Sequence, residues 1–283
     1  MGFSADWLAL REPADHRSRS AQMLADLAKR VENRDVLRVT DLGCGTGSNL
    51  RATAPALNAR QEWTLVDYDF ALLEQAARSL TEWADEAKAI GDDLVLIKDG
   101  RNIGVKFRIA DLNKELEQVI SGDIDVVTAS ALFDLISESW MRRFITALKA
   151  TPAIFYTVLT YNGEDDFLPA HPFDWGIINA FKIHQRRDKG FGPAEGPQAA
   201  ATLARLLSEA GYSVETADTP WVLKPSDIQL KTELLKGLHG AAMETGLVSD
   251  NGANDWLFWR TSMGDQKGSR MTTGHTDILA AKG

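Results

Sequence analysis

The stretch "VTDLGCGTGSNL", residues 39–50, is the strongest structural signal in this chain of 283 residues. An apolar and β-branched run leads into three glycines at alternate positions, Gly43, Gly45 and Gly47, and a helix-like segment follows. Glycine adopts backbone conformations that are costly for other residues, and it lets a ligand approach the main chain closely. A strand, a glycine-rich turn and a helix in this order predict that a nucleotide-like ligand is held at the start of the helix.

Outward from this stretch, strand patterns alternate with helix patterns. Amphipathic spacing predicts helices, and short apolar or alternating runs predict strands. Strands that alternate with helices of this length indicate right-handed βαβ units and a parallel sheet. The predicted helices cover residues 20–32, 46–57, 70–89, 137–150 and 196–212. The predicted strands cover 36–43, 62–69, 123–132 and 153–160, with a hairpin-like pair at 93–100 and 105–112 and two closing strands at 213–223 and 274–282.

The second half of the chain carries long connections between these elements. Residues 161–196 form an irregular connection with one short helix pattern at 174–185, and residues 224–270 hold two further helix patterns. Long loops in compact domains are usually lids or binding elements. We therefore predict a single domain over 1–283, with an N-terminal helical cap over 1–35 and two lid or substrate insertions.

The composition favours an enzyme without a structural metal. The formal net charge is −9, whereas nucleic-acid binders normally carry a basic face, so nucleic acid is not an expected partner. One cysteine, Cys44, excludes an intramolecular disulfide and a cysteine-based zinc cluster, and the five histidines show no ligand spacing. No apolar run has the length of a membrane span, and the N-terminus lacks a secretory signal pattern. We expect a cytoplasmic protein with neither a metal nor a membrane partner.

The glycine turn alone suits either a dinucleotide or S-adenosylmethionine. The dinucleotide pattern G-x-G-x-x-G asks for a small residue five positions after the first glycine, and Ser48 stands there as a near miss. Asp41 discriminates better, because a pyrophosphate at the end of this strand would meet a carboxylate of like charge. A cofactor with an ammonium and a sulfonium group is instead attracted. The sequence therefore favours S-adenosylmethionine.

Two further acids stand at predicted strand ends. Asp67, in "LVDYD", can accept hydrogen bonds from both ribose hydroxyls, although dinucleotide folds carry an acid at the same place. Asp111, in "RIADL", can accept from the adenine amino group while apolar neighbours cover the ring. The alternative role is helix capping, by Asp111 ahead of residues 113–120 and by Asp67 ahead of a helix that Asp69 can also cap.

Together, "VTDLGCGTG", "LVDYD", "RIADL" and "DVVTASALFDL" resemble the class I S-adenosylmethionine-dependent methyltransferase family in order and spacing, over roughly residues 36–150. The resemblance implies an α/β fold, Rossmann-like and doubly wound, with a mostly parallel seven-stranded sheet, an antiparallel last strand and helical lid insertions. It also implies S-adenosylmethionine as the cofactor. The cofactor residues are then Asp41, Gly43, Gly45 and Gly47 around the methionine moiety, Asp67 at the ribose, Asp111 and Leu112 at the adenine, Ser130 at the end of the fourth strand, and Tyr68.

The acceptor side of the site is inferred from residues beyond that fourth strand. Asp134, in "ALFDLISESW", would lie beside the transferred methyl group as a general base or an orienter of the nucleophile, and a structural acid is the alternative. The stretch "FKIHQRRDKGFGP", residues 181–193, is basic within an acidic chain, so it either clamps an anionic group of the acceptor or forms a solvated loop. The predicted catalytic residues are Asp134 and His184, and the predicted substrate contacts are Tyr161, Arg186 and Lys189.

These observations predict methyl transfer from S-adenosylmethionine to a small metabolite that bears an anionic group. The long insertions favour an enclosed pocket and hence a small acceptor. The alternatives are a methyltransferase acting on a protein side chain and a cofactor-binding module without catalysis. A nicotinamide dehydrogenase is a third alternative, which the Asp41 carboxylate disfavours. Arg17 and Arg19 are interpreted as surface charges, with a contact to the cofactor carboxylate as the alternative. The methylated atom and the oligomeric state stay open.

Overall fold

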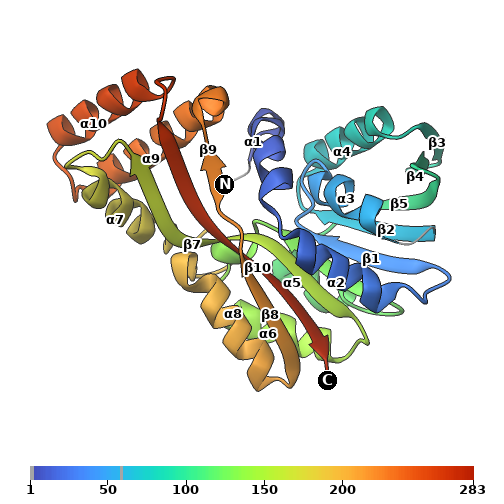
Figure 1. Cartoon of the computed structure of the whole chain (residues 1–283). Helices are drawn as coiled ribbons and strands as arrows, with labels where there is room; N and C mark the ends of the chain where they lie inside the picture. Colours follow the sequence, from blue (N-terminus) through green and yellow to red (C-terminus); the bar gives the residue numbers. More distant parts are fainter. Residues whose placement is uncertain (1–2, 58–59) are drawn as a thin grey trace.

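The computed structural model of this chain describes residues 3–57 and 60–283, and one mixed sheet runs through it (Figure 1). In the described residues the sheet has ten strands, in the order β3-β4-β5-β2-β1-β6-β7-β10-β8, with β9 paired to β10. The strands are β1 (Leu37–Leu42), β2 (Arg60–Asp67), β3 (Glu86–Ile90), β4 (Asp93–Lys98), β5 (Arg101–Ile109), β6 (Val126–Ser130), β7 (Ile154–Leu168), β8 (Tyr212–Asp218), β9 (Trp221–Leu223) and β10 (Arg270–Lys282).

Helices cover both faces of this sheet, as a doubly wound fold requires. The buried side chains of α2, α3 and α4 join one hydrophobic core, and those of α5, α6 and α8 join a second. None of the helices in the described residues is long and apolar enough to cross a membrane. The helices are α1 (Ala5–Ser18), α2 (Ala21–Val31), α3 (Ser48–Thr53), α4 (Phe70–Trp83), α5 (Leu112–Val119), α6 (Glu138–Lys149), α7 (Asp174–Gln185), α8 (Ala199–Glu209), α9 (Ile228–Thr245) and α10 (Asp250–Met263).

The order of the parallel strands fixes where a ligand can bind. Strands β5, β2, β1, β6 and β7 run parallel, and the chain leaves β1 in one direction along the sheet and returns beside it as β6. Ligands of open α/β sheets bind beyond the carboxyl ends of the strands at such a switch point. The last strand, β10, runs antiparallel between β7 and β8, which confirms the predicted antiparallel last strand. The β3–β4 hairpin and β9 add further strands to the predicted seven-stranded sheet.

The helix predicted over 70–89 is wrong beyond Trp83. α4 ends at that residue, and β3 follows as an edge strand that pairs antiparallel with β4, Glu86 opposite Ile97. Every residue of β3 is exposed, so no alternating apolar pattern marks it as a strand. Backbone pairing with β4 therefore overrides the helix-favouring glutamate, alanine and lysine side chains of this segment.

The irregular connection predicted over 161–196 is wrong in its first part. β7 continues to Leu168, where it pairs with Arg270 of β10, so the two long strands extend past the rest of the sheet (Figure 1). The register shifts opposite Gly274, where an added Cβ would lie 2.1 Å from Asn162 Oδ1. The polar run at the bend hides the strand pattern in the sequence. α7, α9 and α10 pack beside this extension, in the two regions predicted as insertions.

Candidate active site

The glycine loop follows β1 at the switch point, and its three glycines all adopt left-handed backbone conformations. The φ angles are 63° at Gly43, 53° at Gly45 and 77° at Gly47, a region that disfavours side chains. Gly47 N–H donates to Cys44 O at 2.9 Å, and α3 starts directly after the loop. An added Cβ at Gly45 would lie 3.0 Å from Leu8 of α1. The loop is thus a tight turn covered by the N-terminal helix.

Asp67 is the last residue of β2 and is hydrogen-bonded to this loop. Its Oδ2 accepts from Gly45 N–H at 2.9 Å, and its Oδ1 accepts from Asp69 N–H at 3.0 Å. Burial raises the pKa of Asp67, and the N–H groups of Asp69 and Gly45 oppose that rise. A carboxylate can accept about four hydrogen bonds, so lone pairs stay available for hydroxyl donors. Asp69, as predicted, provides the N-cap of α4.

Apolar surface lies next to Asp67 at the ends of two neighbouring strands. Tyr68 follows β2 and is 60% exposed, and Ile109, which pairs with Asp67 in the sheet, is 57% exposed. Large apolar side chains at the carboxyl edge of a sheet suit a planar ring. Ser130, at the end of β6 on the other side of β1, is half-buried.

Asp41 is fully buried at the end of β1 and only half satisfied. Its Oδ1 accepts from Asn49 Nδ2 at 2.7 Å, whereas its Oδ2 is buried without a partner in the described residues. Burial raises the pKa of Asp41 to about 7, although the Asn49 hydrogen bond and the positive charge of Arg19 lower it. A buried carboxylate oxygen without a donor is costly, so this oxygen marks a place for a cationic or N–H-bearing group.

Asp111 makes the contacts of a helix cap, which is the alternative role predicted for it. It is the N-cap of α5, accepting from Asn113 N–H at 2.9 Å, and it pairs with Lys114 at 2.9 Å. The Lys114 contact lowers the pKa of Asp111. Leu112 is buried, and its carbonyl accepts from Trp140 Nε1. A role of either residue at an adenine ring stays a prediction.

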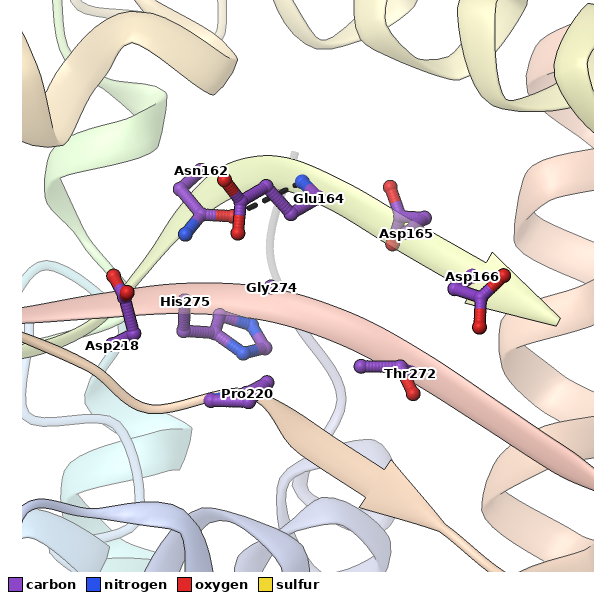
Figure 2. Close-up of a pocket in the computed structure, with 9 residues that line it drawn as sticks. All are labelled: Asn162, Glu164, Asp165, Asp166, Asp218, Pro220, Thr272, Gly274 and His275. Carbon is purple, nitrogen blue, oxygen red and sulfur yellow. Dashed lines mark hydrogen bonds between the residues drawn. The ribbon is translucent and has the colours of Figure 1, made fainter.

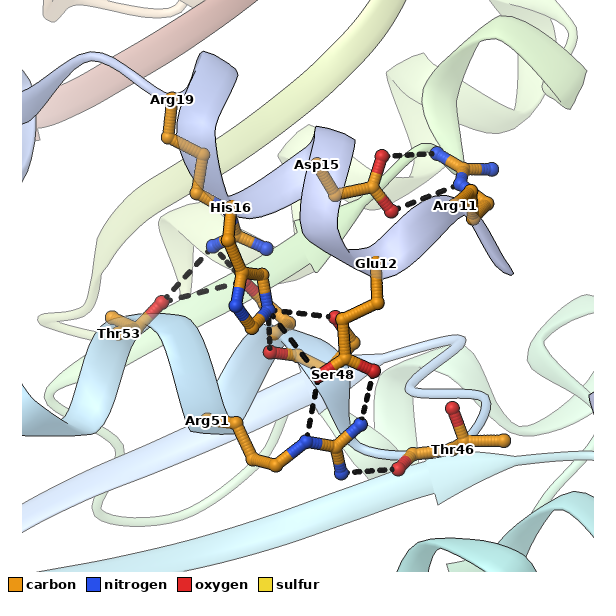
Figure 3. A network of polar contacts seen from close by, with 10 residues as sticks. Arg11, Glu12, Asp15, His16, Arg19, Thr46, Ser48, Arg51 and Thr53 are labelled. Atoms are coloured by element: carbon orange, nitrogen blue, oxygen red, sulfur yellow. Dashed lines mark hydrogen bonds and ion pairs between the residues drawn. The ribbon is translucent and has the colours of Figure 1, made fainter. Parts of the chain in front are cut away.

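A polar network in the N-terminal helix holds α1 against the glycine loop (Figure 3). Arg51 of α3 donates to both oxygens of Glu12, at 2.8 and 2.5 Å, and to Thr46 O at 2.8 Å. His16 Nε2 lies 3.0 Å from Ser48 Oγ. This network cannot be predicted from the sequence, because single charged residues on a helix do not reveal which loop they contact.

Asp134 follows β6 in a short 3₁₀ turn and is 8% exposed. Its Oδ1 has no hydrogen-bond partner in the part of the chain that the structure describes. Burial raises the pKa of Asp134 to about 6, against the opposing effects of Arg11, Lys189 and the N–H groups of Asp134 and Tyr161. A carboxyl with this environment can accept a proton near neutral pH.

Comparison with known proteins identifies this arrangement. No protein-family model matches the chain. The trans-aconitate 2-methyltransferase of Mycolicibacterium gilvum (strain PYR-GCK) is 27% identical over 212 residues, which are 74% of this chain and 69% of that relative. A cyclopropane-fatty-acyl-phospholipid synthase-like protein from Lactobacillus casei ATCC 334 has a TM-score of 0.53 at 14% identity, over 99% of this chain and 94% of that chain. A cyclopropane synthase from Mycobacterium tuberculosis has a TM-score of 0.50 at 11% identity, over 98% and 94% of the two chains.

These similarities support a class I S-adenosylmethionine-dependent methyltransferase. The structural likenesses establish the Rossmann-like fold, and the curated relative carries the methyltransferase assignment. The methyltransferase's glycine loop, Asp67 and Asp134 all lie at the carboxyl ends of β1, β2 and β6, as the motif order predicts.

The basic side chains of residues 181–193 have different environments in the structure. Lys189 is half-buried; burial and the nearby Arg187 lower the pKa of Lys189, while the charge of Asp134 acts in the opposite direction. His184 Nε2 lies 3.1 Å from Glu244 Oε2, and Arg187 donates to the same carboxylate. Arg186 is exposed. Within residues 181–193, Lys189 is therefore the basic side chain whose charge acts on Asp134.

Tyr161 of β7, a predicted substrate contact, packs in a group with His275 and Trp221, which were not predicted from the sequence. Its hydroxyl donates to Asp165, and its ring lies 6.4 Å from the His275 ring, which in turn lies 4.9 Å from the Trp221 ring. Arg11 covers the Trp221 ring at 5.1 Å. His275 and Trp221 come from closing strands whose apolar patterns indicate core positions, so no sequence signal distinguishes them.

His275 also lines an acidic hollow of about 260 Å³ beside the bend in β7 and β10 (Figure 2). Burial, with the nearby positive charge of Arg11, lowers the pKa of His275 to about 3, so the imidazole is neutral. The other lining residues are Asn162, Glu164, Asp165, Asp166, Asp218, Pro220, Thr272 and Gly274.

Proposed function

We propose that this methyltransferase transfers the methyl group of S-adenosylmethionine to a small metabolite that carries an anionic group. The observation that carries the proposal is the buried Asp134 carboxyl, with one unpartnered oxygen and the positive charges of Arg11 and Lys189 acting on it. The 27% identical relative is named for trans-aconitate, a tricarboxylate, which supports an anionic acceptor. Burial of Asp134 supports a small acceptor over a protein side chain.

The residues at the switch point fit S-adenosylmethionine. The glycine loop allows close approach to the backbone, the unpartnered Asp41 oxygen suits the ammonium, and Asp67 has lone pairs for the ribose hydroxyls. Tyr68 supplies apolar surface next to Asp67. We further propose that Asp111 and Leu112 contact the adenine and that Ser130, at the end of β6, belongs to the cofactor site.

The chain's own residues align the acceptor and take up its proton. The bound cofactor supplies a methyl group that is already activated, so catalysis needs mainly proximity and alignment. Asp134, whose pKa burial raises to about 6, is largely ionised at pH 7 and can accept the proton of an acceptor hydroxyl or amine. Lys189 binds the anionic group, with His184 and Arg186 as further members of the predicted clamp. We propose that residues 1–35, 161–196 and 224–270 enclose the acceptor within one domain.

Transfer of labelled methyl groups from S-adenosylmethionine to a panel of metabolites tests this function. The panel pairs carboxylic acids, including trans-aconitate, with their amides, and adds a denatured protein extract as a macromolecular acceptor. We expect labelled acids and unlabelled amides, a fall in kcat of about 10²-fold or more for Asp134→Asn, and a raised KM for Lys189→Ala. Labelling of protein alone would reject a small-metabolite acceptor in favour of a protein side chain. Cofactor binding without any transfer would indicate a non-catalytic module.

A further inference from the structure

Arg19, at the junction of α1 and α2, has a guanidinium of which only one nitrogen donates hydrogen bonds in the described residues. Its Nη1 donates to Asn49 Oδ1 at 2.7 Å and to Thr53 Oγ1 at 3.2 Å, both on α3 (Figure 3). Its Nε and Nη2 are buried and have no hydrogen-bond partner in residues 3–57 and 60–283. These two nitrogens form the edge of the guanidinium that presents paired N–H donors to a carboxylate. The interpretation of Arg19 as a surface charge is therefore wrong.

The same edge of two neighbouring arginines binds a carboxylate. Arg11 Nε and Nη2 donate to the two oxygens of Asp15, at 2.9 and 3.2 Å. Arg51 Nε and Nη2 donate to the two oxygens of Glu12. Among the arginines drawn in Figure 3, Arg19 is thus the one whose paired-donor edge carries no carboxylate in the described structure.

The turn that presents Arg19 is fixed on both sides. Ser18 Oγ donates to Ala14 O at 2.8 Å, and Ser20 N–H donates to Asp277 Oδ2 at 3.1 Å. Asp277 in turn accepts from Leu159 N–H at 2.9 Å. An anchored guanidinium loses little further conformational freedom when it binds an anion, so the site is preorganised.

Asn49 connects this cationic edge to the buried anion of the site. Its Oδ1 accepts from Arg19, and its Nδ2 donates to Asp41 Oδ1 at 2.7 Å. On the two sides of one amide, Arg19 therefore has two unpartnered donors and Asp41 one unpartnered acceptor. This pair complements a zwitterion, a carboxylate on one carbon with an ammonium beside it.

We propose that Arg19 binds the carboxylate of the cofactor's amino-acid end in a bidentate contact, opposite the ammonium site at Asp41. The proposal rests on the proposed function, because it names the contacts of S-adenosylmethionine at that same site. A carboxylate would satisfy both buried donors and neutralise the guanidinium, which an uncharged ligand group does not. Arg17, two residues earlier, offers no such edge, because it is more exposed and its Nη2 pairs with Asp227 at 2.8 Å.

Calorimetric titration of the purified full chain tests the contact without requiring turnover. The two ligands are S-adenosylmethionine and its decarboxylated form, which keeps the adenosine, sulfonium and ammonium groups and lacks only the carboxylate. For the wild type we expect about 10- to 100-fold weaker binding of the decarboxylated form. Arg19→Ala should bring the ratio of the two dissociation constants close to one by weakening S-adenosylmethionine alone. Arg19→Lys should lie between, because a point charge cannot make the paired contact.

Arg17→Ala is the matched control, and it should keep the wild-type ratio. A wild type that binds both ligands equally, or Arg19 variants that keep the wild-type ratio, would overturn the carboxylate contact while leaving the proposed function in place. Failure of the wild type to bind S-adenosylmethionine at all would instead reject the proposed function. Circular dichroism reports whether each variant folds, and Arg19→Lys decides the question if Arg19→Ala does not.

Discussion

At the residue scale, the buried Asp41 carboxyl sets how the proposed cofactor site depends on pH. Burial raises the pKa of Asp41 to about 7. The Asn49 hydrogen bond and the charge of Arg19 lower this pKa, whereas the charge of Asp67 raises it further. An ammonium group binds the ionised carboxylate. Below pH 7 the protein must therefore lose a proton from Asp41 before it can bind an ammonium there.

We expect the affinity for S-adenosylhomocysteine to increase as the pH rises from 6 to 8. The gain should approach tenfold per pH unit below the pKa of Asp41 and level off above it, because the ligand's ammonium, which the carboxylate on the same carbon stabilises, stays mostly protonated over this range. Calorimetric titrations at several pH values measure the slope. Asp41→Asn should bind more weakly with a flat profile, and methylthioadenosine, which lacks the ammonium, should give a flat profile with the wild type. An unchanged slope in Asp41→Asn would assign the titration to another group.

At the element scale, α1 packs over the glycine loop of the proposed cofactor site. Its Glu12 pairs with Arg51, whose side chain is only 8% exposed, and its Leu8 lies over Gly45. Removing one partner of a buried ion pair leaves an uncompensated charge, whereas an exposed pair contributes little. The helix therefore depends on a few contacts to stay over the loop.

Glu12→Ala should lower the free energy of unfolding by about 2–4 kcal/mol, because the Arg51 guanidinium loses its carboxylate. It should also weaken S-adenosylhomocysteine binding and speed proteolysis near the α1–α2 turn. Urea denaturation, calorimetry and limited trypsin digestion measure the three effects. The matched control is Glu138→Ala on α6, which removes a solvent-accessible carboxylate that pairs with the exposed Arg142 and Arg205 and should change stability by less than about 1 kcal/mol. Equal stability of the two variants would show that the pair does not hold α1.

At the scale of the whole molecule, the sequence predicts the parallel strands and their ligand edge, because apolar strands and left-handed glycines leave a local pattern. It fails at β3 and at the outer half of β7, because their polar side chains carry no alternation and their backbone partners lie far away in sequence. The same limit applies to the site. Asp41 and Asp67 are predicted from their place at strand ends, whereas the unpartnered edge of Arg19 exists only once α1 and α3 are packed together.

The buried carboxyls also make the stability of the ligand-free methyltransferase depend on pH. Burial raises the pKa of Asp41 to about 7 and that of Asp134 to about 6, both above the ordinary value of 3.8. A group whose pKa is higher in the folded state stabilises the fold fully below its unfolded pKa, and this contribution is lost as the pH rises through the folded value. These two groups therefore lower the stability between about pH 4 and pH 7.

Asp41→Asn should therefore raise the melting temperature of the ligand-free protein at pH 8, by about 5 °C, and leave it nearly unchanged near pH 4.5. The amide keeps an oxygen that can accept from Asn49, and it removes the charge that burial disfavours. Scanning calorimetry without ligand measures the shift, with Asp123→Asn as the control because Asp123 is exposed and its ion pair is with an exposed Arg38. The same variant binds the cofactor more weakly in the titrations above. A melting temperature that falls at pH 8 would mean that Asp41 is already neutralised within the fold, and its unpartnered oxygen would then have no cation left to attract.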